Sequence, residues 1–329
     1  MLGVIHHQLW REEEALVYIN RALQINPQMA AAYSNKGLVL HRLMRLNEAI
    51  ASYSQAITLA PGFVDALYNR ANAYKDKQSF ALACADYEQI LKLDPGSSYC
   101  LGTLLYTRAS MCDWRSQHLL PQLAQQVAAS TRASLPFTLL TLLDDPYLQL
   151  ACARIYIADR YPPRPALWRG EIYRHQRIRI AYLSADFHDH ATAYLMAELF
   201  ELHDHASFEI HVFSFGVDKS GAMRQRLSNA VTRFYDVNAA SDAQIATMLR
   251  QQEIDIAIDL KGFTQHSRSA IFSYRAAPVQ VNYLGYPGTM GAPYIDYIIA
   301  DRHIIPAEDD CYYQEKVVRL PDSYQVNDS

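Results

Sequence analysis

The sequence predicts an α-solenoid of helical hairpins at the N-terminus, followed by a helical connecting region and one parallel α/β domain. Two observations predict this fold class. A 34-residue repeat runs through the first third of the chain, and segments of strand and helix character alternate through its second half. The length of 329 residues is enough for two or three domains.

The repeat is marked by a proline that ends a similar phrase in each unit, ALQINP, AITLAP and ILKLDP. These prolines are 34 residues apart, at Pro27, Pro61 and Pro95. Gly37 and Ala71 share one phase, where two helices must touch, and the apolar residues follow helical spacing. The pattern resembles the tetratricopeptide repeat (TPR), a pair of antiparallel helices per unit, over residues 1–96. By phase, Met1 falls inside the first helix of an incomplete first unit.

Two asparagines occupy one phase of the first helix in successive units, Asn35 and Asn69. Stacked repeats form a concave groove. A side-chain amide both donates and accepts hydrogen bonds, so it can pair with a peptide backbone of any sequence. We therefore predict that these asparagines bind an extended polypeptide; the alternative is that both are solvated helix residues.

The connecting region, residues 97–175, is predicted to be helical without the repeat. Asp145 and Pro146 are typical of a helix start, with an acidic cap and a proline at the first position. The segment YPPRPALWRGEIYRHQ is rich in proline and charge, which places a domain boundary near residue 175.

Residues 176–329 are predicted to form a parallel sheet with helices on both faces, because strands and helices alternate at the required spacing. Ser241 is predicted to cap one of these helices. The strand segments are 178–187, 208–216, 233–237, 254–260, 279–285, 296–301 and 316–322. Ligands bind beyond the carboxyl ends of such strands. We therefore expect the loops after the first, fourth and fifth strands, at 184–192, 259–266 and 284–291, to converge on one edge.

Composition excludes several classes of protein. The net charge of −4 disfavours a nucleic-acid binder. Five scattered cysteines without a C-x-x-C pair disfavour a zinc ribbon or a disulfide framework and favour the reducing cytoplasm. No apolar run reaches the ~18 residues of a membrane span, and the start of the chain turns acidic at once, unlike a signal peptide. The motifs G-x-G-x-x-G and G-x-x-x-x-G-K-[ST] are also missing from the sequence, which disfavours nicotinamide dehydrogenases and P-loop NTPases.

The first of the three loops carries the densest chemistry, with Asp186, His188, Asp189 and His190. These residue types fit zinc or manganese, but their spacing on a loop is not a known ligand pattern. Acid–base chemistry is favoured, because a histidine titrates near neutrality and can take a proton from a hydroxyl or stabilise a leaving phosphate. Asp186 would orient the histidine or pass the proton on; alternatively it caps the next helix.

The segments SADFHDHATAYLM, DLKGFTQHSRSAIFSYRAAPVQ and YLGYPGTMGAPYIDYIIAD resemble the protein O-linked N-acetylglucosamine (O-GlcNAc) transferases and their bacterial homologues. That family joins TPRs to two Rossmann-like domains in the GT-B arrangement. The resemblance implies that residues 176–329 are the N-terminal Rossmann-like half. Asp186 and His190 match the catalytic Asp and His of the family. The positions that match its donor-binding residues are Thr192, Gly262, Thr264, Leu284 and Gly285.

The resemblance implies transfer of N-acetylglucosamine from UDP-GlcNAc, a nucleotide-sugar substrate, to Ser or Thr of a protein that lies along the repeat groove. It implies no metal and no cofactor. The sequence ends at LPDSYQVNDS, where the link to the second Rossmann-like domain is expected, so we expect the 329-residue chain alone to be inactive. The alternatives are a non-catalytic TPR binding module and a protein O-fucosyltransferase of the Spindly type, which shares the layout.

Overall fold

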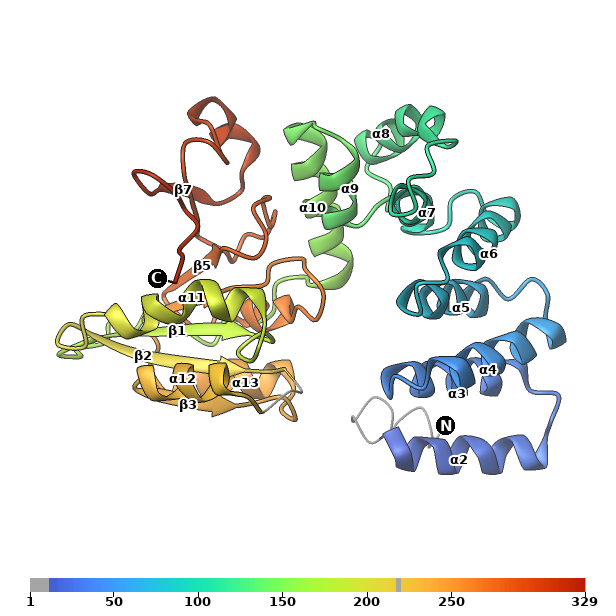
Figure 1. Cartoon of the computed structure of the whole chain (residues 1–329), viewed down its shortest axis with the longest axis horizontal. Coiled ribbons are helices and arrows are strands. Elements are labelled where there is room, and N and C mark those ends of the chain that lie inside the picture. The colour runs from blue at the N-terminus through green and yellow to red at the C-terminus, as the bar shows by residue number, and fades with distance from the viewer. Residues whose placement is uncertain (1–11, 217–219, 329) are drawn as a thin grey trace. The chain divides into compact units, whose positions relative to one another are not determined.

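The computed structural model describes residues 12–216 and 220–328 (Figure 1). By its internal contacts the chain divides into two compact units, and the division falls after Leu143. The first unit is built of helices and the second contains the sheet. The predicted fold class, helical repeats followed by a parallel α/β domain, is confirmed.

Among the residues that the structure describes, the repeats form one helix followed by two complete helical hairpins. The helices are α2 (Glu12–Ile25), α3 (Ala30–Arg42), α4 (Leu46–Leu59), α5 (Val64–Asp76) and α6 (Phe80–Leu93). Helices α2, α4 and α6 each end two residues before a repeat proline, as expected because proline disfavours the helical conformation of the residue before it. The prediction for Met1 lies outside the described residues.

Close contact between helices explains the small residues of the repeat. A β-carbon at Gly37 would lie 2.6 Å from the ring of Tyr53, which is fully buried. Ala71 and Tyr87, one repeat later, are also fully buried. The predicted contact at this phase is therefore confirmed.

The predicted connecting region is divided between the two units. Helices α7 (Cys100–Ala109), α8 (Leu120–Ala128) and α9 (Pro136–Leu142), with the short 3₁₀ helix η1 (Gln117–Leu119), belong to the first unit, and α10 (Pro146–Arg160) belongs to the second. The Asp145 carboxylate accepts a hydrogen bond from the Leu148 backbone N–H at 3.0 Å, which confirms the predicted helix start.

The second unit contains a seven-stranded parallel sheet of order β3-β2-β1-β4-β5-β6-β7. The strands are β1 (Ile178–Ser184), β2 (Phe208–Ser214), β3 (Arg233–Asp236), β4 (Ile256–Asp259), β5 (Val279–Tyr283), β6 (Tyr297–Ala300) and β7 (Lys316–Arg319). The connecting helices are α11 (Ala191–Leu202), α12 (Ala222–Ala230) and α13 (Asp242–Gln251), with 3₁₀ helices η2 (Ser269–Tyr274) and η3 (Ala307–Tyr312). Ser241 caps α13 in a capping box, as predicted.

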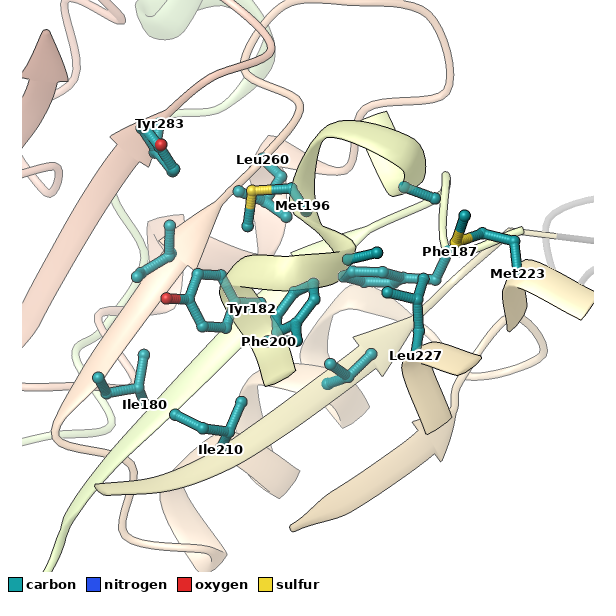
Figure 2. Packing of buried hydrophobic residues seen from close by; sticks show 14 of the residues in the cluster. Ile180, Tyr182, Phe187, Met196, Phe200, Ile210, Met223, Leu227, Leu260 and Tyr283 are labelled. Carbon is teal, nitrogen blue, oxygen red and sulfur yellow. The ribbon is translucent and has the colours of Figure 1, made fainter. Parts of the chain in front are cut away.

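The order of the strands reverses between β1 and β4. Helices α11 and α12 pack against each other and bury Met196, Phe200 and Leu227 against the strands (Figure 2). Helix α13 instead packs against η2. At such a reversal, the loops after two neighbouring strands run to opposite faces of the sheet and leave a crevice at the carboxyl ends of the strands. A doubly wound sheet binds its ligands in this crevice.

The helices in the described part of the chain are all too short or too polar to cross a bilayer.

Candidate functional site

The loop after β1 is anchored in the core beside the residue predicted to be catalytic. Phe187 is buried and packs edge-to-face on Phe200 of α11, with ring centroids 6.1 Å apart (Figure 2). The Ser184 hydroxyl accepts a hydrogen bond from the Asp186 backbone N–H at 3.0 Å. These contacts fix the direction in which Asp186 leaves the strand.

A buried ion pair joins this loop to the one after β4. Lys261 Nζ donates to Asp186 Oδ2 at 2.5 Å, and both side chains are only 7% exposed. Charges that are taken out of water need such a partner, since an unpaired one is strongly destabilising. The pair therefore holds two segments 75 residues apart in sequence together at the strand reversal.

His190 caps helix α11. Its Nδ1 accepts a hydrogen bond from the Thr192 backbone N–H at 3.2 Å, and it lies 3.7 Å from Asp186 Oδ2. The alternative in which Asp186 caps this helix is therefore wrong, because the capping atom belongs to His190. The two residues predicted to be catalytic lie side by side, as the acid–base hypothesis requires.

Asp259, the last residue of β4, is buried two residues before Lys261. Its Oδ1 accepts a hydrogen bond from the Lys261 backbone N–H at 2.9 Å, whereas Oδ2 has no donor among the described residues. Burial raises the pKa of Asp259 to about 6, against the opposing effect of the Lys261 backbone and charge. Asn282, its partner on β5, likewise has a buried Oδ1 without a donor in the described structure.

The loop after β5 lies directly against the loop after β4. A β-carbon at Gly285 would come within 2.1 Å of the Leu260 carbonyl oxygen, and one at Gly262 within 2.4 Å of Tyr286 Cβ. Leu284 has a φ of +70°, which is rare for a non-glycine residue, and the Gly285 N–H donates to the Tyr283 carbonyl across it. Strained backbone of this kind is often found at binding sites.

A second buried carboxylate, that of Glu315, accepts hydrogen bonds from this loop. Glu315 accepts hydrogen bonds from the Thr289 hydroxyl and the Met290 N–H, both at 2.7 Å. Burial raises the pKa of Glu315.

The two threonines predicted to bind the donor have different surroundings. Thr192 is in the first turn of α11, next to the His190 cap. The Thr264 hydroxyl donates to the Lys261 carbonyl at 2.8 Å, so it closes the turn that carries the lysine. Both lie in the loops that the ion pair brings together; their contact with a donor stays a prediction.

Asn35 and Asn69 are half-buried in α3 and α5 of the first unit. These two helices are neighbours, since a hydrogen bond of 2.8 Å joins His41 Nε2 of α3 and Asp76 Oδ2 of α5. The asparagines thus recur on adjacent first helices of the repeat, as the predicted binding of an extended polypeptide requires. Their binding of a polypeptide stays a prediction.

The sequence alone assigns no catalytic or binding role to Lys261 or Asp259. The available signal was a lysine directly after the predicted apolar strand at 254–260. It was missed because a sequence does not show which carboxylate lies opposite. Among the described residues, no group of three His, Cys, Asp or Glu side chains is placed to hold a metal ion.

Comparisons with known proteins agree with this architecture. Residues 150–329 match the model of glycosyl transferase family 41, and residues 1–29, 30–63 and 64–97 match tetratricopeptide repeat models. The matched family region is 180 of the 329 residues, more than half of the chain.

Two relatives and one solved structure illustrate the similarity. The probable UDP-N-acetylglucosamine–peptide N-acetylglucosaminyltransferase SEC of Arabidopsis thaliana is 34% identical over 245 residues, which are 68% of this chain and 25% of that protein. The probable UDP-N-acetylglucosamine–peptide N-acetylglucosaminyltransferase SPINDLY of Petunia hybrida is 31% identical over 161 residues, which are 48% of this chain and 17% of that protein.

A solved structure of a mutant O-GlcNAc transferase from Thermobaculum terrenum superposes with a TM-score of 0.64 at 24% identity, over 98% of this chain and 56% of that one. The chain thus spans less than two thirds of each of these relatives. The family match over residues 150–329, together with the repeats before it, shows that this chain is a TPR-containing member of glycosyl transferase family 41.

Proposed function

We propose that this chain supplies the acceptor-binding repeats and the N-terminal catalytic half of a protein O-GlcNAc transferase, which transfers N-acetylglucosamine from UDP-GlcNAc to Ser or Thr. The observation that carries this proposal is the meeting of three loops at the strand reversal. Asp186 is paired with Lys261, and Lys261 lies on the backbone that Gly285 touches.

The proposed roles follow from the placement of each group. The strained backbone at Leu284 and Gly285 lines the sugar pocket, and the lack of a side chain at 285 lets this backbone pack closely against Leu260 of the loop after β4. Thr192, in the first turn of α11, lies beside the donor phosphates, which the positive end of a helix favours. Asp186 and His190 either assist removal of the acceptor proton or order the acceptor.

The acceptor polypeptide is proposed to lie along the repeats, with its backbone paired to Asn35 and Asn69. The five free cysteines support a reducing compartment, and we propose the cytoplasm.

Saturation-transfer NMR with the 329-residue chain tests the donor, because this method detects weak ligands. The N-acetyl protons of UDP-GlcNAc are expected to receive saturation from the protein, and this signal should be lost in Gly285→Ala. The control Gly62→Ala, where a β-carbon has open space around it, should keep the signal. Preference for GDP-fucose would support the Spindly-type alternative. Binding of an unfolded peptide with no signal from either sugar would favour the binding module.

A further inference from the structure

Three charged or polar side chains, those of Asp186, His190 and Lys261, meet at the start of α11. The ring of His190 is the exposed member, with 42% of its side chain accessible. Asp186 and Lys261 are buried behind it. The ring of His188 is also near, with its centroid 5.7 Å from that of His190.

The first constraint is the helix cap. His190 Nδ1 accepts a hydrogen bond from the Thr192 backbone N–H at 3.2 Å. A ring nitrogen that accepts a hydrogen bond carries no proton, so the neutral imidazole must carry its proton on Nε2. Loss of this bond would leave a backbone N–H of the first helical turn without its side-chain partner.

The second constraint is the Asp186 carboxylate, which favours a proton on Nδ1 rather than on Nε2. A carboxylate beside a histidine commonly accepts the Nδ1 proton, and Asp186 Oδ2 lies only 3.7 Å from Nδ1. This oxygen is, however, the atom to which Lys261 Nζ donates at 2.5 Å. The ammonium group occupies the oxygen and neutralises its charge, so the carboxylate competes weakly for the imidazole proton.

We propose that Lys261 is a positioning residue for His190: by pairing with Asp186 it keeps Nδ1 of His190 as the acceptor that caps α11 and leaves an Nε2–H pointing away from the cap. This inference rests on the proposed function only for what that N–H contacts. An Nε2–H donates a hydrogen bond and cannot accept a proton. Of the two roles left open for His190, the geometry therefore assigns the ordering of a substrate oxygen.

The tautomer of His190 can be measured in the free chain. Long-range ¹H–¹⁵N correlation spectra separate the two neutral forms, and His190→Gln identifies the signals of this ring. The spectra are recorded at about pH 8.5, two units above the pKa of a free imidazole. We expect the Nε2–H form in the unaltered chain; an Nδ1–H form would overturn the proposal without any variant being needed.

Variants then test the part played by Lys261. In Lys261→Met the unpaired Asp186 carboxylate should draw the proton, so the spectrum should change to the Nδ1–H form. The double variant Lys261→Met/Asp186→Ala lacks this acceptor and should keep Nε2–H. Lys316→Met removes an exposed lysine of the same unit and should also leave the ring unchanged.

Chemical rescue separates positioning from a general structural effect. Lys261→Cys alkylated with bromoethylamine restores an ammonium group at the same distance along the side chain, and the Nε2–H form should return. An unchanged tautomer in Lys261→Met would contradict the role of the lysine. None of these spectra requires a sugar donor, so the proposed function fails separately, by its own donor-binding test.

Discussion

Gly285 lies so close to Leu260 that a β-carbon on the glycine would be 2.1 Å from the leucine carbonyl oxygen. The two residues belong to the loops after β5 and β4, and the second of these loops is tied by Lys261 to Asp186 after β1. A backbone contact and a buried ion pair therefore assemble one site from three segments.

The close approach at Gly285 predicts that Gly285→Ala disrupts the site. The neighbouring atom is backbone oxygen, which cannot rotate away, so the loops must separate. We expect a loss of about 3 kcal/mol in unfolding free energy, at the upper end of overpacking costs, and loss of donor binding. Urea denaturation followed through the NMR signals of the sheet amides measures the first effect.

Gly62→Ala is the matched control, since a β-carbon there meets no atom within 4 Å. It should change stability by less than about 1 kcal/mol. Equal effects of the two substitutions would contradict the close packing of the β4 and β5 loops.

The ion pair of Lys261 and Asp186 predicts strongly non-additive mutations. Lys261→Met or Asp186→Ala alone leaves a buried charge without its partner and should cost about 3–5 kcal/mol of stability. The double variant removes both charges and should recover at least about 2 kcal/mol of the summed loss. Simple addition of the two single effects, measured in the same urea experiments, would show that the side chains do not interact.

Asp259 predicts a pH dependence of stability. Burial raises its pKa in the folded chain to about 6 from an ordinary 3.8, so folding favours the protonated carboxyl. The contribution of protonated Asp259 to folding stability is complete below pH 3.8 and is lost as the pH rises through 6. Asp259→Asn cannot ionise and also offers a donor next to Asn282, its strand partner. Between pH 4 and 7 the free energy of unfolding of the variant should therefore rise relative to that of the unaltered chain. The difference should reach up to about 3 kcal/mol, at ~1.4 kcal/mol per pKa unit.

The comparison for Asp259 is between two pH profiles, since other groups titrate in both proteins. Urea midpoints measured from acid to neutral pH should diverge in favour of the asparagine variant. Parallel profiles would mean that Asp259 is solvated or paired in solution.

The asparagines of the repeats predict a loss of peptide binding without a loss of stability. Each half-buried amide is expected to contribute about 1 kcal/mol through its hydrogen bonds to the peptide. Asn35→Ala/Asn69→Ala should therefore weaken binding of an unstructured Ser/Thr-rich peptide by about 30-fold while the melting temperature stays constant. Fluorescence anisotropy measures the affinity.

Asn20→Ala, at an exposed position on α2, is the control for this pair and should bind the peptide like the unaltered chain. If the double variant binds equally well, the asparagines are ordinary solvated helix residues.

The sequence predicted the fold through features that act locally. The spacing of Gly37 and Tyr53 follows from helix packing, and the Ser241 cap follows from hydrogen bonding within four residues. The helical type of a short segment is harder to predict than its existence: Ser269–Tyr274 forms a 3₁₀ helix. At the site, the convergence of the loops was predictable from the parallel topology. The pairing of Lys261 with Asp186 was not, because it depends on side chains 75 residues apart.

The most direct test of the account is a ¹H–¹⁵N map of the amides that UDP-GlcNAc perturbs in this chain. The account predicts coupled shifts in the loops at 184–192, 259–266 and 284–291, with one shared affinity, and no shifts at the amino ends of the strands. Perturbations confined to one loop, or centred elsewhere on the sheet unit, would contradict a single donor site built from all three.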